Sequence, residues 1–308
     1  MHVRVAAFFF SALLVSFWVC ACAPAVQTPQ SPTAVEPSLP PATQTPESAS
    51  APAPVAMPLP SAAPSATPAG CREAHGRIER QEARRADFPI ALRVRIYLPP
   101  CYGEEAGRRY PLLILLHGQS QDETLWERLG LVEETERLIA AGEIEPFIVV
   151  MPREEYYLQE PSESLFGRAL TELLLPWVER TYSVSPQRER RAIGGISRGA
   201  FWATRVGWEN WQMFASIGAH SLPAVPFYEV AFRDLYKTIP ENQRPRYYMD
   251  HGVLDGYLRD ANEWHNLLVK YMAAHTWVSS PGGHTEAYWS GQMETYLRWY
   301  AAPWKEQS

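Results

Sequence analysis

Short apolar segments alternate with amphipathic ones along most of the chain, starting near residue 91. In residues 91–98 (ALRVRIYL), apolar and polar side chains alternate, which predicts a half-buried strand. Residues 111–116 (PLLILL) are apolar throughout, as in an inner parallel strand that is covered on both faces. Further strands are predicted over residues 147–151, 191–194, 214–219, 246–250 and 275–278.

The segments between these strands have the length and periodicity of helices. Helices are predicted over residues 125–141, 162–182, 198–208, 227–236, 261–274 and 286–300. Strands that alternate with helices form a mostly parallel central sheet flanked by helices, with right-handed crossovers. In such sheets, reactive groups collect beyond the carboxyl ends of the strands. The pattern therefore predicts one α/β domain over residues 71–308, with its site among the polar residues that follow the strands.

The N-terminal residues follow a different pattern. A single Arg precedes the apolar run 5–19 (VAAFFFSALLVSFWV), which is typical of a secretory signal. We therefore expect residues 1–22 to be a signal peptide. Residues 19–22 (VCAC) also resemble a bacterial lipoprotein lipobox, in which Cys22 becomes lipid-modified. An ordinary cleaved signal and an uncleaved membrane helix are the alternatives.

The composition of residues 23–70 predicts a disordered linker. This segment holds 13 of the 28 prolines and contains no aromatic residue, Lys or Arg. Without large apolar side chains, it does not offset the entropy of ordering its backbone. We expect an exported chain, either secreted or held at the outer face of the cytoplasmic membrane, with membrane contact only through the N-terminal lipid anchor or signal segment.

The charge balance excludes one class of partner. The formal net charge is −6 at pH 7, from 28 basic and 34 acidic residues. Phosphate binding needs a concentrated basic surface. The Arg residues between positions 77 and 85 are interleaved with Glu, which is typical of a solvated face. Nucleic acid is therefore not an expected partner.

Cys71 and Cys101 are the only cysteines of the predicted domain. In an oxidising compartment such a pair can form a disulfide. The bridge would close a loop of about 30 residues and stabilise the domain by a few kcal/mol on the loop-entropy model. We expect this disulfide, and two unpaired thiols are the alternative.

Residues 195–199 (GISRG) match the pattern G-x-S-x-G between a predicted strand and a predicted helix. In that context the Ser occupies a cramped turn that raises its hydroxyl above the sheet, and the two glycines let strand and helix approach closely. We expect Ser197 to be a nucleophile. A Ser hydroxyl needs a base to take its proton and an acid to hold that base, so a His and a carboxylate are required.

The chain order that suits this turn is Ser, then acid, then His. Asp255 lies in a loop after the strand 246–250, and His284 lies in a loop before the last helix. We expect Asp255 to be the acid and His284 the base, with Asp250 as the alternative acid. His251, His265 and His275 also follow the nucleophile. His265 and His275 fall on or beside a predicted helix, where a packing or surface role is expected.

Two backbone N–H groups must bind the oxyanion that forms during acyl transfer. One is expected from Arg198, directly after the nucleophile, and the other from Gln119 in the turn after the strand 111–116. His117 is expected to have a structural role before this turn, and His220 is expected to be a satisfied core or pocket-wall histidine.

Metal binding is an alternative role for some of these residues. The donors that a metal could use here are Asp250, His251, Asp255 and His284. No tight ligand spacing supports such a site, and no metal or cofactor is expected.

In their order, these motifs resemble the esterase family of the α/β-hydrolase fold. That family includes esterase D (S-formylglutathione hydrolase), feruloyl and acetyl xylan esterases, enterochelin esterase and bacterial mycolyltransferases. The resemblance is carried by residues 97–100 (YLPP), 109–118 (RYPLLILLHG), 149–152 (VVMP), 194–199 (GGISRG), 250–252 (DHG) with Asp255, and 281–284 (PGGH).

The resemblance implies an α/β-hydrolase fold with Ser197 as nucleophile, Asp255 as acid and His284 as base. It also implies an oxyanion hole at Gln119 and Arg198. The sequence departs from the family at Arg198, where many members carry Met or another apolar residue. It departs again at residue 200, where Ala replaces a frequent Gly.

The expected activity is hydrolysis of carboxylic esters by a serine esterase through an acyl-enzyme. The connection 221–244 is too short for a large lid, so short-chain or aromatic acyl esters of small molecules or carbohydrates are the expected substrates. Four aromatic residues are candidates for the pocket, although each could instead pack in the core: Trp126, Tyr156, Tyr157 and Trp202. The competing interpretations are an acyltransferase, which moves an acyl group to a sugar or wall hydroxyl, and a non-catalytic glycan- or wall-binding module.

Overall fold

The computed structural model describes residues 73–225 and 228–305, all within the compact unit Ser61–Ser308. The predicted signal peptide, the linker, Cys22 and Cys71 lie outside the described residues. The signal, the lipid anchor, the linker and the Cys71–Cys101 disulfide therefore stay predictions.

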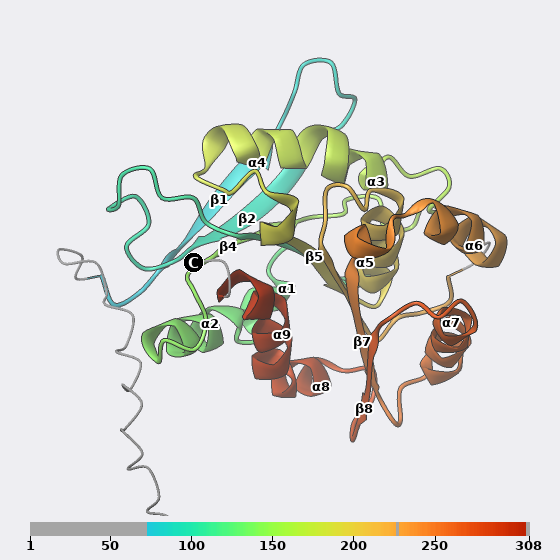
Figure 1. Cartoon of the computed structure of the whole chain (residues 1–308). Coiled ribbons are helices and arrows are strands. Elements are labelled where there is room, and N and C mark those ends of the chain that lie inside the picture. Colours follow the sequence, from blue (N-terminus) through green and yellow to red (C-terminus); the bar gives the residue numbers. More distant parts are fainter. Residues whose placement is uncertain (1–72, 226–227, 306–308) are drawn as a thin grey trace, which may run out of the picture. The chain divides into compact units, whose positions relative to one another are not determined.

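A mixed, mostly parallel sheet forms the centre of the domain (Figure 1). The strands are β1 (Arg77–Ala83), β2 (Leu92–Leu98), β3 (Leu112–Leu116), β4 (Ile148–Pro152), β5 (Arg191–Ile196), β6 (Ser216–His220), β7 (Arg246–Gly252) and β8 (Thr276–Ser280). Their order in the sheet is β1-β2-β4-β3-β5-β6-β7-β8. β1 and β2 pair antiparallel with their neighbours, whereas the strands from β4 to β8 are all parallel. The predicted fold is confirmed.

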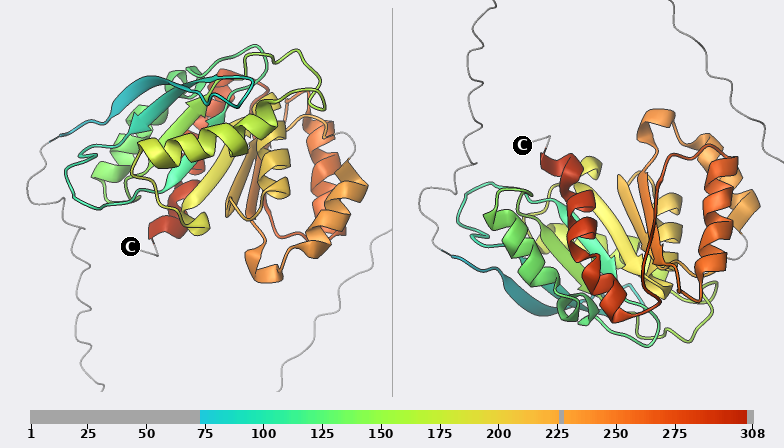
Figure 2. Two further views of the ribbon diagram at one scale, coloured as in Figure 1. Left: turned by 90° about the horizontal axis from the view of Figure 1, so that it is seen from above. Right: turned by 90° about the horizontal axis from the view of Figure 1, so that it is seen from below.

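Helices cover both faces of the sheet (Figure 2). They are α1 (Leu125–Arg128), α2 (Leu131–Ala140), α3 (Phe166–Ala169), α4 (Leu175–Thr181), α5 (Arg198–Glu209), α6 (Tyr228–Thr238), α7 (Leu258–Lys270), α8 (Glu286–Gly291) and α9 (Met293–Lys305), with a π-helical turn η1 (Leu170–Leu174) and short 3₁₀ turns η2 (Arg188–Arg190) and η3 (Glu241–Gln243). α1, α2, α8 and α9 pack on one face, and α3 to α7 on the other. The resulting three layers bury two cores.

The apolar run of β3 is explained by these two cores. Leu112, Ile114 and Leu116 pack in the core beneath α5, whereas Leu113 and Leu115 pack in the core beneath α9. Alternate side chains of a strand point to opposite faces, so a strand covered on both faces must be apolar at every position. The continuous run therefore predicted this strand correctly.

The Arg and Glu residues near the start of the domain form the strand β1, whereas their pattern indicates only a solvated face. All seven residues of β1 pair with β2, from Arg77 opposite Leu98 to Ala83 opposite Leu92. β1 is the edge of the sheet, where charged side chains protect against pairing with another chain. Its polar sequence is compatible with that position.

Two of the predicted helices are interrupted. The segment 125–141 divides at Gly130, which has a φ of 87° between α1 and α2. The segment 162–182 begins only at Phe166 and contains the turn η1 before α4. Pro176 closely follows η1 in this continuous helical segment, and the Glu172 carbonyl, one turn before it, accepts a hydrogen bond from Arg85 Nη1 at 2.5 Å.

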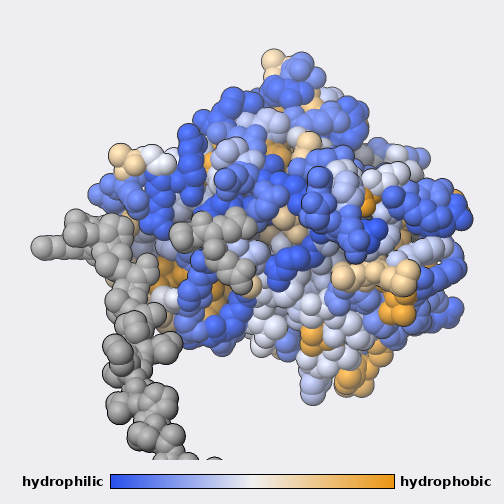
Figure 3. Space-filling view, in the orientation of Figure 1, coloured by the Kyte–Doolittle hydropathy of each residue, from blue (hydrophilic) through white to orange (hydrophobic). Residues whose placement is uncertain are grey.

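The face shown in Figure 3 is predominantly hydrophilic, and apolar residues appear on it in separate areas. Within residues 73–225 and 228–305, no helix combines the length and the apolar character that crossing a bilayer requires.

Candidate active site

Ser197 lies between β5 and α5 with φ 55° and ψ −121°, a backbone conformation that a non-glycine residue rarely adopts. A Cβ on Gly195 would lie 2.3 Å from the backbone carbon of Gly199, and a Cβ on Gly199 would lie 2.4 Å from the backbone oxygen of Leu116. Neither position has space for a side chain. The two glycines therefore let strand and helix meet closely enough to present Ser197 at the carboxyl end of the sheet.

The structure brings His284 and Asp255 together. Nδ1 of His284 lies 3.1 Å from Oδ1 and 3.0 Å from Oδ2 of Asp255. His284 stands in the loop between β8 and α8, and Asp255 in the loop between β7 and α7. Since an ionised carboxylate only accepts hydrogen bonds, the proton lies on Nδ1, and Nε2 is the nitrogen with a free lone pair.

The surroundings of Asp255 keep its carboxyl ionised. Burial alone would raise the pKa of Asp255, but hydrogen bonds from His284, from the Tyr257 N–H and from the Ser221 hydroxyl lower it below its ordinary value. The Tyr257 N–H donates to Oδ1 at 2.8 Å. A charged acid in this position orients the imidazole and stabilises its protonated form.

Ser221 and Trp289 are site residues that the sequence analysis missed. The Trp289 Nε1–H donates to Ser221 Oγ at 2.9 Å, while the Ser221 hydroxyl donates to Asp255. The Trp289 ring also lies against the His284 ring, with centroids 5.0 Å apart. Ser221 directly follows the carboxyl end of β6, and this position was the one signal that could have marked it.

Asp250, the alternative acid, belongs to a different network. Its carboxylate lies 2.7 Å from His220 Nδ1 and accepts hydrogen bonds from the hydroxyls of Tyr288 and Tyr296 at 2.8 and 2.7 Å. His220 Nε2 lies 2.9 Å from the Tyr300 hydroxyl. The whole group is buried. Asp250 is thus a core residue whose charge is satisfied by the C-terminal helices, and the placement favours Asp255 as the acid.

The other histidines occupy positions away from the His284–Asp255 pair. His251 is buried against Trp277, and His265 Nδ1 lies 2.8 Å from His275 Nε2. Among the residues that the structure describes, no group of three or more His, Cys, Asp or Glu side chains is arranged to hold a metal ion.

Ser197 follows β5 and His284 follows β8, so both lie at the carboxyl ends of the parallel strands. Both belong to the described part of the chain, and the structure places no hydrogen bond between the Ser197 hydroxyl and the imidazole. In free enzymes such contacts are often long and shorten when substrate binds.

The two expected oxyanion donors lie on either side of the Ser197 turn. Arg198 is the first residue of α5, where a backbone N–H has no partner within the helix. Gln119 is in the turn after β3, and a Cβ on the preceding Gly118 would lie 3.4 Å from the Ser197 Cβ. The turn is therefore adjacent to Ser197.

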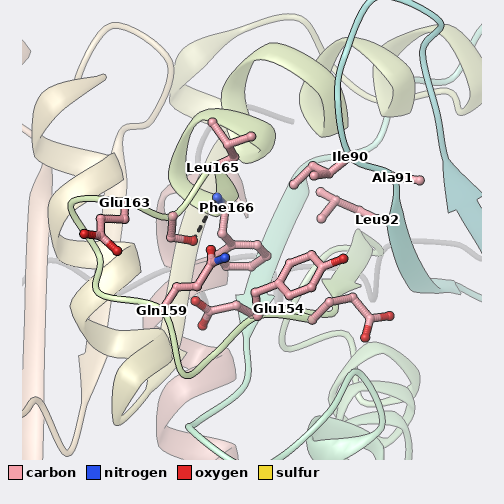
Figure 4. Close-up of a pocket in the computed structure, with 11 residues that line it drawn as sticks. Ile90, Ala91, Leu92, Glu154, Gln159, Glu163, Leu165 and Phe166 are labelled. Atoms are coloured by element: carbon pink, nitrogen blue, oxygen red, sulfur yellow. Dashed lines mark hydrogen bonds between the residues drawn. The ribbon is translucent and has the colours of Figure 1, made fainter.

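A cavity of about 140 Å³ lies between β2, α3 and the loop after β4 (Figure 4). Its lining residues are Ile90, Ala91, Leu92, Glu154, Glu155, Tyr156, Gln159, Glu163, Ser164, Leu165 and Phe166. Tyr156 is among the expected pocket residues, whereas the adjacent Tyr157 does not line this cavity. Trp126 and Trp202 are each only 1 % exposed and pack in the two cores, which favours the packing role that was their alternative.

Comparisons with known proteins identify the family of the chain. The model of a family described as "Putative esterase" matches residues 88–300. Esterase Rv1288 of Mycobacterium tuberculosis is 34 % identical over 140 residues, which are 42 % of this chain and 29 % of that protein. An endo-1,4-β-xylanase/feruloyl esterase of Xylanibacter ruminicola is 30 % identical over 138 residues, 40 % of this chain and 18 % of that protein. The chain thus spans less than a third of the length of either relative.

A solved structure shares the fold. The ferulic acid esterase AmCE1/Fae1A of Anaeromyces mucronatus, in complex with ferulic acid, superposes with a TM-score of 0.61. The match covers 76 % of this chain and 93 % of that one at 18 % identity. At that identity the likeness shows the α/β-hydrolase fold alone. The family model covers most of the domain, and the chain therefore belongs to the esterase family described as "Putative esterase".

Proposed function

We propose that the chain hydrolyses carboxylic esters through an acyl-enzyme formed on Ser197. The observation that carries the proposal is the contact between His284 Nδ1 and the Asp255 carboxylate. This pair lies beyond the carboxyl ends of the parallel strands, as does Ser197 in its strained strand-to-helix turn. Family membership supports ester hydrolysis as the reaction.

In the first half of the reaction, the Ser197 hydroxyl attacks the ester carbonyl while Nε2 of His284 takes its proton. The oxyanion accepts hydrogen bonds from the amides of Arg198 and Gln119. The tetrahedral intermediate then collapses, the C–O bond to the alcohol breaks, and His284 returns the proton to the departing oxygen. Asp255 stays ionised and stabilises the imidazolium.

In the second half, water takes the place of the alcohol. His284 accepts a proton from water, and the hydroxide attacks the acyl-Ser197 carbonyl. Collapse of the second intermediate releases the carboxylic acid, and the proton goes back to the Ser197 oxygen.

The cavity beside the site supports aromatic or short-chain acyl esters, of small molecules or carbohydrates, as substrates. A cavity of about 140 Å³ is close in volume to the apolar cavity of roughly 150 Å³ that binds benzene in another protein, which is room for one ring. The rings of Tyr156 and Phe166 line it together with apolar side chains and three glutamates, and none of its lining residues is basic. A neutral ring therefore fits better than an anionic group. The feruloyl esterase names among the relatives agree with this substrate class.

The test is a panel of esters run on the purified domain, with Ser197→Ala as the control. Acetyl, feruloyl and acetylated-sugar esters should be hydrolysed at different rates, and the variant should lose turnover of all of them while it stays folded. Turnover by the variant would reject Ser197 as the nucleophile. Acyl products on an added sugar acceptor would indicate an acyltransferase, and failure of a fluorophosphonate probe to label Ser197 would indicate a non-catalytic module.

We propose further that the domain acts outside the cytoplasm, attached through a lipid on Cys22 and stabilised by a Cys71–Cys101 disulfide. Detergent phase partitioning of the full chain and of Cys22→Ala tests the anchor. Thiol counting before and after reduction tests the disulfide, and two free thiols in the unreduced mature protein would contradict it.

A further inference from the structure

The side chain of Arg198 is held by Glu154. The Arg198 Nε–H donates to Glu154 Oε2 at 2.8 Å, and the Nη2–H donates to Oε1 at 2.7 Å, so the ion pair is bidentate. A further hydrogen bond from Nη2 to the Gln159 carbonyl measures 2.9 Å. The side chains of Arg198 and Glu154 are 13 % and 3 % exposed. Both partners are therefore fixed in a part of the site that excludes most solvent.

The backbone of Glu154 is bound in turn to His117. The Glu154 N–H donates to His117 Nε2 at 2.9 Å. Since Nε2 accepts, the proton of the neutral ring lies on Nδ1, which donates to the Gly118 carbonyl at 2.8 Å. Burial lowers the pKa of His117, which keeps the ring in this neutral form.

These contacts link the two sides of the oxyanion hole. Arg198 supplies one expected amide donor, and Gly118 directly precedes Gln119, which supplies the other. We name the four connected residues Arg198, Glu154, His117 and Gly118 the oxyanion bracket. Within it, Glu154 holds one donor segment by its side chain and the other by its backbone.

We propose that Glu154 is a positioning residue that fixes the two amide donors of the oxyanion hole relative to each other. The inference rests on the proposed acyl transfer at Ser197. Donors arranged in advance stabilise the developing oxyanion without reorganisation during the reaction, so a small displacement of one amide lowers the rate. The effect acts on the transition state and leaves the ground-state complex nearly unchanged.

The alternative is that the pair serves only folding. A buried ion pair is a poor source of stability, because desolvation of both charges offsets their attraction, and apolar residues of similar size often serve as well. The family resemblance places Met or another apolar residue at position 198. Because this chain has Arg at position 198 and buries its partner Glu154, we expect the ion pair to position the amide donors and not to stabilise the fold.

The experiment compares Glu154→Gln with a matched variant elsewhere. Glu154→Gln keeps the shape and the backbone contact with His117 but loses the two-pronged charged contact. The control is Glu145→Gln, because Glu145 pairs with Arg190 at 2.8 Å with both side chains at most 13 % exposed, next to the amino end of β5. Arg198→Lys tests the same contact from the other side, since Lys lacks the planar fork.

We expect Glu154→Gln and Arg198→Lys to lower kcat for p-nitrophenyl acetate by about tenfold or more, with KM within about twofold, whereas Glu145→Gln keeps the wild-type kcat. Affinity for a boronic acid, which forms a tetrahedral adduct on Ser197, should fall in parallel with kcat. Thermal unfolding measures the stability loss of all three variants separately.

An unchanged kcat and boronate affinity in folded Glu154→Gln would overturn the inference, and so would an increase in KM alone. If the wild type hydrolyses no ester and forms no boronate adduct, the proposed function fails instead. The wild type and Ser197→Ala are therefore measured first.

Discussion

Nδ1 of His284 lies 3.0 Å from Oδ2 of Asp255, and this contact fixes the tautomer of the imidazole. With the proton on Nδ1, Nε2 faces away from the carboxylate and can accept the proton of a nucleophile. The carboxylate in turn is held by the Tyr257 N–H and by the Ser221 hydroxyl. Asp255 therefore holds the imidazole of His284, and Tyr257 and Ser221 hold Asp255, before any substrate binds.

Asp255→Asn tests this orientation. The amide can donate a hydrogen bond to Nδ1 and so favour the wrong tautomer of His284, and it no longer stabilises the imidazolium. We expect kcat to fall by about a thousandfold or more with little change in KM, measured on p-nitrophenyl acetate. Circular dichroism of the variant should match the wild type. Activity within tenfold of the wild type would show that Asp255 is not the acid.

The choice between Asp250 and Asp255 illustrates the limits of the sequence. Asp250 lies near the carboxyl end of β7 and Asp255 in the loop that follows it, both precede His284, and both suit the expected order of the triad. The hydroxyls of Tyr288 and Tyr296, which lie 38 and 46 residues downstream on α8 and α9, donate hydrogen bonds to the Asp250 carboxylate. These contacts come from the tertiary structure, and no local sequence pattern around residue 250 indicates them.

Other parts of the fold can be predicted from the sequence because the local residue pattern and the packing of the folded domain require the same residues. The turn at Ser197 is specified by Gly195 and Gly199, whose close contacts leave no room for another residue. β1 was missed because an edge strand has one partner and tolerates polar residues on both faces. The ion pair between Glu154 and Arg198 joins residues 44 positions apart, and the motif does not specify it, because Arg198 occupies a variable position of G-x-S-x-G.

Ser221→Ala should reveal a positioning role for this hydroxyl. The variant loses the hydrogen bond to Asp255 and leaves the Trp289 Nε1–H without its acceptor. We expect kcat to fall by about five- to tenfold, equivalent to about 1 kcal/mol, with KM unchanged. Ser290→Ala is the matched control, because the Ser290 hydroxyl donates only to the Leu129 carbonyl at 3.0 Å. Equal kcat values for the two variants would remove Ser221 from the site.

Tyr156→Ala tests the cavity as a substrate pocket. The side chain lines the cavity yet is 60 % exposed, so its removal should not disturb folding. We expect KM for a feruloyl or sugar ester to rise by about fivefold or more, since loss of a ring contact costs about 1 kcal/mol, while hydrolysis of p-nitrophenyl acetate stays unchanged. Tyr257→Ala is not a suitable control, because that ring packs on His284. Met272→Ala is a better control, because Met272 is exposed and does not line the cavity. Equal effects of Tyr156→Ala and Met272→Ala on KM would show that the cavity does not bind the substrate.

His251→Phe should stabilise the domain and reduce its sensitivity to acid. His251 is buried against Trp277, and neither ring nitrogen has a hydrogen-bond partner among the described residues. An unsatisfied buried polar group costs about 1–3 kcal/mol, which an apolar ring of similar size avoids. The variant should therefore unfold at a higher temperature at pH 7.

The pH dependence follows from the direction of the shift. Burial lowers the pKa of His251, so the unfolded chain binds a proton more readily than the folded chain does. The stability of the wild type should then fall as the pH decreases below the unfolded pKa of about 6.5, until the folded pKa is reached. Because burial also lowers the pKa of His117, the His251→Phe variant should keep part of this slope. Denaturant unfolding at pH 7.5, 6.5 and 5.5 measures both slopes, and a steeper slope in the variant than in the wild type would contradict the assignment of a neutral buried His251.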